Sequence, residues 1–300
     1  MGLSAGRLKR GIDMPVELEL RTPYLRLAAR VWGPPDGIPV LALHGWLDNA
    51  ASFDTLAPLL PDVRLVALDL PGHGHSDPRP PGIHYHFVDY IPDVAAAADA
   101  LGWERFALLG HSLGGGIVSF TAATLPNRVT RVAMIEGLGP PTSDPADGPA
   151  NLRKAIEKMN GLSRKNRVNP PIYPNLEAAI QARCEASGLS WTAASILVSR
   201  SIQSVDEGFG WRTDPRLRFV SPSYLSEPQI LAYMERIEAP ALLICGADGY
   251  LVKRAYMQER YARIADLTVK ILSGGHHPHL EDPEPCARLL APFFAAARAT

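Results

Sequence analysis

The chain has 300 residues, a formal net charge of −1 and 46% hydrophobic residues. This length allows one large α/β domain or two small ones, and the apolar content is enough for a sizeable core. The balanced charge disfavours nucleic-acid and membrane-surface proteins, so neither kind of partner is expected.

The N-terminal residues and the cysteines predict a cytoplasmic protein. Residues 1–10 carry charge but precede no apolar run, so a signal peptide is not expected. Gly6 stands where myristoylation would require Ser or Thr. No window approaches the ~18 apolar residues of a membrane span. The cysteines lie far apart, which disfavours a disulfide framework and a zinc site: Cys184, Cys245 and Cys286.

The first third of the chain predicts a hairpin followed by buried strands. Residues 16–20 alternate between apolar and polar side chains, as does part of 24–32, which is typical of an antiparallel hairpin at a sheet edge. The apolar runs 39–43 and 63–68 predict buried strands of a parallel sheet. Between these two runs, Ser52 is a suitable cap for a helix that we expect to end at Leu60.

The next segment alternates helices and strands. Residues 87–101 predict a helix that Gly102 ends, and the apolar run 106–109 predicts a strand. A helix follows over 113–125, and then a strand over 131–135. This alternation, with its right-handed crossovers, predicts a parallel sheet with helices on both faces.

The turn between the strand at 106–109 and the next helix matches the pattern G-x-S-x-G, with Ser112 at its centre. Glycine is required at 110 and 114 because a Cβ there would meet neighbouring backbone. The turn exposes the Ser112 hydroxyl. It also places the amide of Leu113 at the start of a helix, where free N–H groups and the helix dipole favour an anion.

The alternation stops after Glu136. Residues 137–224 contain proline clusters and helical patterns near 150–160, 175–187 and 190–203. We interpret them as a helical cap inserted between the sixth and seventh strands, which leaves 1–136 and 225–300 as the core domain. A disordered linker is the alternative, but residues 176–202 are too apolar for one.

After the expected cap, the strand–helix pattern resumes. Residues 227–237 and 255–264 predict helices, and 241–245 and 267–272 predict strands. Pro283 begins a last amphipathic helix that we expect to reach about residue 297.

Four segments distributed over almost the whole chain resemble the signatures of the α/β-hydrolase superfamily. They are His44-Gly45-Trp46, Asp69-Leu-Pro-Gly-His-Gly-His-Ser76, Gly110-His-Ser-Leu-Gly114 and Gly275-His-His-Pro-His-Leu-Glu-Asp-Pro283. More narrowly, the chain is similar to the serine hydrolase-like protein branch, on the segments His44-Gly-Trp-Leu-Asp-Asn-Ala50, Pro58-Leu-Leu-Pro61, Asp214-Pro-Arg-Leu217 and Gly249-Tyr250. The resemblance implies an α/β fold with a mostly parallel eight-stranded sheet.

Ser112 needs a base to take its proton, because a serine hydroxyl is a poor nucleophile. In α/β-hydrolases this base follows the last strand. His276 stands there, and Gly274-Gly275 would turn its side chain over the sheet edge. His277 is the alternative base.

Two carboxylates could orient that base. Asp248 follows the strand 241–245, where such folds usually keep the acid, but only Ala247 separates it from Gly246 and the usual spacing has two residues. Glu136 ends the strand 131–135, where a mostly buried carboxylate would need an imidazolium as its partner. The resemblance to the serine hydrolase-like branch favours Glu136, because that branch keeps an acid there and does not reliably keep one at position 248.

The backbone amides of Leu113 and Trp46 are expected to form the oxyanion hole. Asp69, His73 and His75 could suggest a metal site, but they lack a distant third histidine, and Gly72 and Gly74 indicate a structural loop. No cofactor or metal is therefore expected.

These residues together predict a serine hydrolase that cleaves a small carboxylic ester or a related acyl compound through an acyl-enzyme. Haloalkane dehalogenases are similar in the position of a glutamate acid, but they and the epoxide hydrolases use an aspartate nucleophile, so Ser112 disfavours both chemistries. The alternatives on the same fold are a C–C bond hydrolase, a lyase or a receptor that binds a small molecule without turnover.

Overall fold

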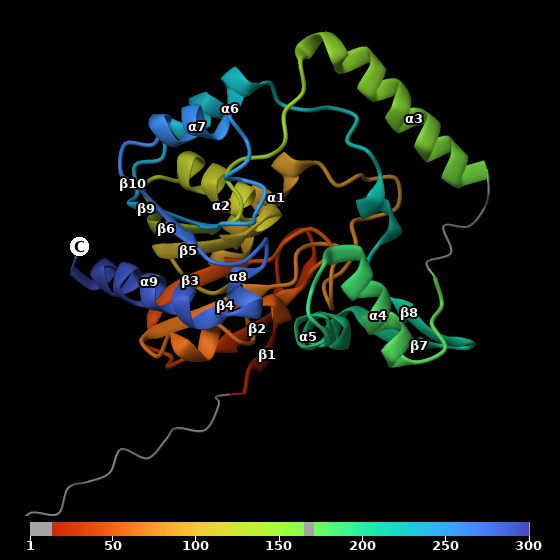
Figure 1. Cartoon of the computed structure of the whole chain (residues 1–300), viewed down its shortest axis with the longest axis horizontal. Coiled ribbons are helices and arrows are strands. Elements are labelled where there is room, and N and C mark those ends of the chain that lie inside the picture. The colour runs from red at the N-terminus through yellow and green to blue at the C-terminus, as the bar shows by residue number, and fades with distance from the viewer. Residues whose placement is uncertain (1–13, 165–170, 300) are drawn as a thin grey trace, which may run out of the picture.

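The computed structural model of the protein describes residues 14–164 and 171–299. The predictions about a leader or lipid anchor concern residues outside this part. Within it, eight strands form one sheet in the order β1-β2-β4-β3-β5-β6-β9-β10 (Figure 1). The predicted hairpin lies at one edge, as β1 and β2. The strands are β1 (Val16–Arg21), β2 (Arg26–Trp32), β3 (Ile38–Leu43), β4 (Val63–Leu68), β5 (Phe106–His111), β6 (Val129–Ile135), β9 (Ala241–Gly246) and β10 (Leu267–Leu272).

The sheet is mostly parallel, as predicted. Strand β2 is antiparallel to its neighbours β1 and β4, whereas β4, β3, β5, β6, β9 and β10 pair in parallel. The chain leaves β3 for β4 on one side and then returns to place β5 on the other side of β3. Ligands bind in open α/β sheets at such a reversal, outside the carboxyl ends of the strands.

Helices cover both faces of the sheet and form two apolar cores. Alternate side chains of a strand point to opposite faces, so Leu108 belongs to one core and Leu109 to the other. Phe120 of α2 packs in the first core, whereas Phe53 and Leu290 pack in the second. The helices of these layers are α1 (Tyr90–Ala100), α2 (Leu113–Thr124), α6 (Glu227–Met234), α7 (Met257–Arg263), α8 (Pro278–Glu281) and α9 (Pro283–Ala295).

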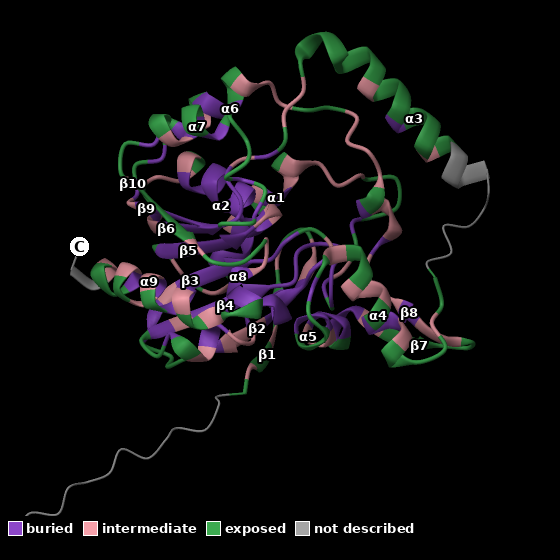
Figure 2. Cartoon of the chain, viewed as in Figure 1, coloured by how far each residue is buried: buried purple, intermediate pink, exposed green. Residues whose placement is uncertain are grey.

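The segment between β6 and α6 carries the three predicted helices, α3 (Gly148–Arg164), α4 (Leu176–Ser187) and α5 (Trp191–Ser201). Figure 2 shows α3 mostly exposed, whereas α4 and α5 bury a common apolar cluster that includes Leu280 of α8. A short hairpin follows them, β7 (Ile202–Val205) with β8 (Gly208–Trp211), which was not predicted from the sequence. None of the helices in the described ranges has the length and apolar character that crossing a membrane requires.

The helix expected from Ser52 to Leu60 is wrong. Two short 3-10 turns take its place, η1 (Ala50–Phe53) and η2 (Ala57–Leu59). The cap is Asn49, whose side chain accepts a hydrogen bond from the backbone N–H of Ala51. Phe53 is fully buried in the second core, so tertiary packing overrides the local helix signal.

Candidate active site

Ser112 lies at a sharp turn between β5 and α2, with backbone angles φ 52° and ψ −111°. This left-handed conformation is costly for a residue with a side chain and is typical of functional turns. The two flanking glycines make the turn possible, because a Cβ at Gly110 would lie 2.3 Å from the carbonyl oxygen of Gly114. A Cβ at Gly114 would lie 2.0 Å from the carbonyl oxygen of Leu43. The steric need for both glycines is as predicted.

His276 follows β10 and faces the serine. Its Nε2 atom lies 2.9 Å from Ser112 Oγ, and its Nδ1 atom lies 3.2 Å from Glu136 Oε2. A neutral imidazole has one N–H and one lone pair. The buried carboxylate accepts from Nδ1–H, so Nε2 is left to accept the serine proton. His277, the alternative base, turns instead toward Asp48, with its Nε2 3.6 Å from Asp48 Oδ2.

Glu136 is fully buried at the end of β6, and its φ is 49°. Its carboxylate accepts hydrogen bonds from the backbone N–H groups of Gly246, at 2.8 Å, and Tyr250, at 3.3 Å. A Cβ at Gly249 would lie 2.2 Å from Glu136 Oε1, so glycine there gives the carboxylate its space. These contacts compensate the burial of the charge.

Asp248, the alternative acid, is exposed. Its backbone N–H donates to the carbonyl of Gly274, and its carbonyl accepts from Lys253 Nζ. Among the described residues, the Asp248 carboxylate makes no hydrogen bond or ion pair with His276. The geometry therefore favours Glu136 as the partner of the histidine.

The two amides expected at the oxyanion hole lie in the loops that follow two adjacent strands. Trp46 follows β3, and Leu113 follows β5, which pairs with β3 in parallel. A hydrogen bond of 3.1 Å from Gly114 N–H to the carbonyl of His44 joins the two loops. The backbone N–H groups of Trp46 and Leu113 donate to no atom of the described chain, which leaves both available to a ligand. The Trp46 indole N–H donates to the Leu217 carbonyl at 3.0 Å.

Two neighbouring cavities lie at the site, and the serine lines one of them. One has a volume of about 570 Å³ and is lined by Ser112, Glu136 and Tyr250 among others. The second, of about 590 Å³, has a mostly apolar and aromatic wall. Both cavities are lined by Trp46, Phe87, Leu113, Pro140 and Pro141. The lining of the second cavity also includes side chains from the segment after β8, among them Leu217 and Phe219.

Tyr250 is a site residue that the sequence analysis did not assign. Its hydroxyl lies 3.1 Å from Ser112 Oγ and 3.2 Å from His276 Nε2. Its ring packs against the His276 ring, with the centroids 4.3 Å apart. Burial raises the pKa of this phenol above its usual value, so the hydroxyl keeps its proton at neutral pH. The sequence signals were its place two residues after the alternative acid and the segment Gly249-Tyr250, which is shared with the serine hydrolase-like branch but was given no role.

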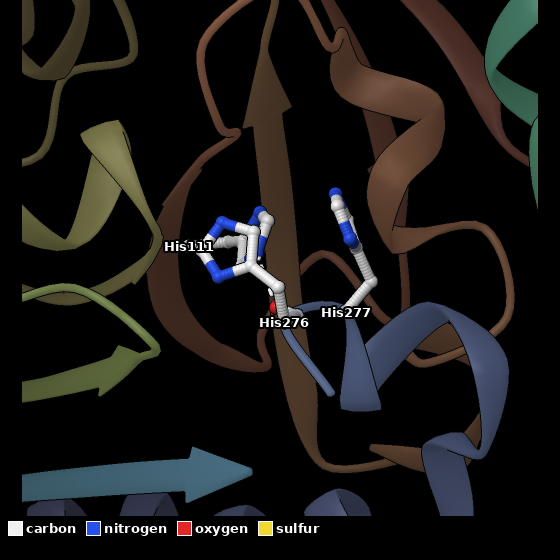
Figure 3. A group of neighbouring side chains, drawn as sticks. All are labelled: His111, His276 and His277. Atoms are coloured by element: carbon white, nitrogen blue, oxygen red, sulfur yellow. Dashed lines mark hydrogen bonds between the residues drawn. The ribbon is translucent and has the colours of Figure 1, made fainter. Parts of the chain in front are cut away.

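Three histidines lie close together beside the site, His111, His276 and His277 (Figure 3). Ring nitrogens of all three lie within 4.8 Å of one another, which is close enough to hold a metal ion. Both nitrogens of His276 already contact Glu136 and Ser112, and His111 Nε2 contacts the His276 carbonyl at 2.9 Å. A metal bound here would therefore take His276 from Ser112.

The loop that contains Asp69, His73 and His75 is held by hydrogen bonds to backbone N–H groups and by a buried ion pair. The Asp69 carboxylate accepts hydrogen bonds from the N–H groups of Ala50, at 2.7 Å, and His75, at 2.8 Å. It also pairs with Arg200 of α5 at 2.9 Å. The His73 ring accepts from Leu47 N–H at 3.2 Å. These partners agree with the structural interpretation of the loop.

Comparison with known families and proteins supports a single assignment. The α/β hydrolase fold family matches residues 38–283. The serine hydrolase-like protein of Danio rerio is 35% identical over 93% of this chain and 88% of its own length. Serine hydrolase-like protein 2 of Homo sapiens is 31% identical over 93% of each chain. The crystal structure of a hypothetical protein from Pseudomonas aeruginosa PAO1 is 41% identical, with a TM-score of 0.88 over 95% of this chain and 99% of that one.

Proposed function

The chain belongs to the α/β hydrolase fold family and is serine hydrolase-like, and from this premise we propose that it cleaves carboxylic esters through an acyl-enzyme on Ser112. One observation carries the proposal. The Oγ of Ser112 lies 2.9 Å from His276 Nε2, and His276 Nδ1 lies 3.2 Å from the buried carboxylate of Glu136. This is the arrangement of a nucleophile, a base and an orienting acid.

In the first half of the reaction, Ser112 Oγ attacks the carbonyl carbon while its proton moves to His276 Nε2. Glu136 stabilises the imidazolium that forms and keeps the ring in one orientation. The negative charge that develops on the carbonyl oxygen accepts hydrogen bonds from the amides of Trp46 and Leu113, and each such donor contributes about 3 kcal/mol to the stability of the transition state. The proton on His276 then moves to the alcohol oxygen, and the alcohol leaves.

In the second half, water takes the place of the alcohol. His276 removes a proton from this water as it attacks the acyl carbon, and the imidazolium returns the proton to Ser112 Oγ as the acid is released. Neither half needs a cofactor.

We propose that residues 137–224 act as a cap that sets substrate size. Leu217 and Phe219 of this segment line the second cavity together with Tyr85 and Phe87 of the core. Such a wall favours an apolar acyl or aromatic group of medium size, because burial of apolar area drives its binding.

A panel of p-nitrophenyl esters of increasing acyl length tests this proposal, with thioesters, lactones and amides alongside. We expect turnover that is highest at medium chain length and is lost in Ser112→Ala. Binding without turnover of any acyl compound would indicate a receptor. Turnover of a carbon–carbon bond in place of esters would indicate the other chemistries of this fold.

A further inference from the structure

The hydroxyl of Tyr250 lies beside the two atoms between which the proton moves. We propose that Tyr250 is a further catalytic residue, whose hydroxyl donates a hydrogen bond to the oxygen of the departing alcohol. It follows that the site is built for esters of unactivated aliphatic alcohols. This inference rests on the proposed function of Ser112 as an esterase nucleophile.

The hydrogen bonds in the free site indicate which atom accepts the hydroxyl proton of Tyr250. Nε2 of His276 has one lone pair, and the nearer donor is Ser112, at 2.9 Å against 3.2 Å for Tyr250. The Tyr250 hydroxyl is then left to donate to Ser112 Oγ, 3.1 Å away. A hydrogen bond donated to Oγ favours loss of the serine proton, because it stabilises the negative charge that develops on that oxygen.

The position of the leaving oxygen follows from the chemistry. In the tetrahedral intermediate this oxygen and Ser112 Oγ are bonded to the same carbon, and the leaving oxygen must also reach His276 Nε2 to take its proton. The Tyr250 hydroxyl lies 3.1 Å from Oγ and 3.2 Å from Nε2. An oxygen that meets both conditions therefore comes next to the tyrosine hydroxyl.

The structure also holds Tyr250 as a fixed donor. Its backbone N–H donates to the Glu136 carboxylate, and its ring packs on His276. Its side chain still borders the cavity, with 42% of the residue exposed. The hydroxyl can therefore meet a substrate without rearrangement of the base or the acid.

Departure of the alcohol needs no additional reactant. As the intermediate collapses, the bond between the acyl carbon and the alcohol oxygen breaks, and the electron pair leaves with that oxygen. The proton on His276 Nε2 moves to it. Tyr250 keeps its own proton and only shares it in a hydrogen bond with the developing alkoxide.

The test compares two esters of one acid in the Tyr250→Phe variant. An ethyl ester has a poor leaving group and needs the hydrogen bond, whereas a p-nitrophenyl ester releases a stable phenolate. Because kcat/KM reports the steps up to release of the alcohol, we expect it to fall at least about tenfold for ethyl butanoate and less than about twofold for p-nitrophenyl butanoate. Tyr24→Phe, which removes an exposed hydroxyl at the β1–β2 turn, should change neither value.

Equal losses with both esters, no loss, or faster turnover would each overturn the inference, the last because it would mean that Tyr250 obstructs the site. A wild-type protein that cleaves the nitrophenyl ester but not the ethyl ester would overturn it as well, while leaving the proposed function intact. A wild-type protein that cleaves neither ester would overturn both. A melting temperature equal to that of the wild type shows that the variant is folded.

Discussion

Among the described residues, three that are not glycine have a left-handed φ, and two of the three belong to the candidate site. They are Leu47 at 63°, Ser112 at 52° and Glu136 at 49°. Each lies just beyond the carboxyl end of a parallel strand. A side chain in this conformation costs roughly 1–3 kcal/mol, which the surrounding structure must offset. In this conformation the side chains of Ser112 and Glu136, which follow two different strands, both contact His276.

Replacing each candidate acid with its amide tests which carboxylate orients His276. Glu136→Gln keeps the shape of the side chain but removes the charge that orients His276 and stabilises its cation. We expect ester turnover, measured as kcat, to fall by about 10²–10⁴. The matched variant Asp248→Asn should retain turnover close to that of the wild type, because Asp248 is exposed. A collapse of turnover in Asp248→Asn alone would reverse the two roles.

The positions of the proposed nucleophile and base could be predicted from sequence because short signatures encode their geometry. Ser112 needs only a strand, two glycines and a helix, all local in the chain. The acid could not be settled, because β6 and β9 are neighbours and a carboxylate at the end of either could reach the histidine. The observations that favour Glu136 are three-dimensional: the space left by Gly249 and the N–H groups of Gly246 and Tyr250.

At the scale of elements, α5 is fixed to the core by a buried arginine. Arg200 is 1% exposed and pairs with Asp69, which is fully buried, and with Glu17 of β1. Asn49 adds hydrogen bonds of 2.8 Å to the Leu197 carbonyl and to Ser201 Oγ. This part of the proposed cap is therefore tied to the sheet edge, whereas α3 is mostly exposed.

Loss of this anchor should destabilise the protein. Arg200→Met removes the charge but keeps the bulk of the chain, and it leaves the Asp69 carboxylate buried without its ion-pair partner. We expect the free energy of unfolding, measured in urea, to fall by about 3 kcal/mol. As a control, Arg288→Ala breaks a surface pair with Glu284, whose side chains are 68% and 74% exposed, and should change stability very little. Equal effects of the two substitutions would contradict the anchor.

Most elements could be predicted because their periodicity is strong and uninterrupted. The failures lie where tertiary contacts decide the local structure. The helix expected after Ser52 gives way to two turns that seat Phe53 in the second core. The β7–β8 hairpin was missed because its strands are short and carry little alternation, and Gly208, with φ 140°, makes the turn possible.

At the scale of the whole molecule, four histidines are fully buried near the carboxyl ends of the strands: His44, His73, His111 and His279. Burial lowers the pKa of each of them, to about 3 for His73 and His111. The pKa values of His44 and His279 are lowered for the same reason. The folded protein therefore keeps His73 and His111 neutral in mildly acidic solution, where an unfolded chain, with histidine pKa values near ~6.5, would bind protons.

This difference makes stability depend on pH. Between pH 6.5 and pH 5 the unfolded state binds more protons, so the free energy of unfolding falls as the pH falls, by up to roughly 1.4 kcal/mol per pH unit for each ring. Urea denaturation across this range measures the slope, and His73→Gln should reduce it by about one proton. Asp54 and Asp93, whose burial raises their pKa, oppose the trend at lower pH. A stability that is constant or rises on acidification would contradict the account.

The central claim is that Ser112 is a nucleophile activated by His276. Treatment with a fluorophosphonate, followed by mass spectrometry of the digested protein, measures this most directly, because the reagent bonds to a serine oxygen only where a base takes its proton. The account predicts a phosphonyl group on Ser112 in the wild type, slower labelling in His276→Ala and none in Ser112→Ala. An unlabelled wild-type protein, or labelling that persists in Ser112→Ala, would contradict it.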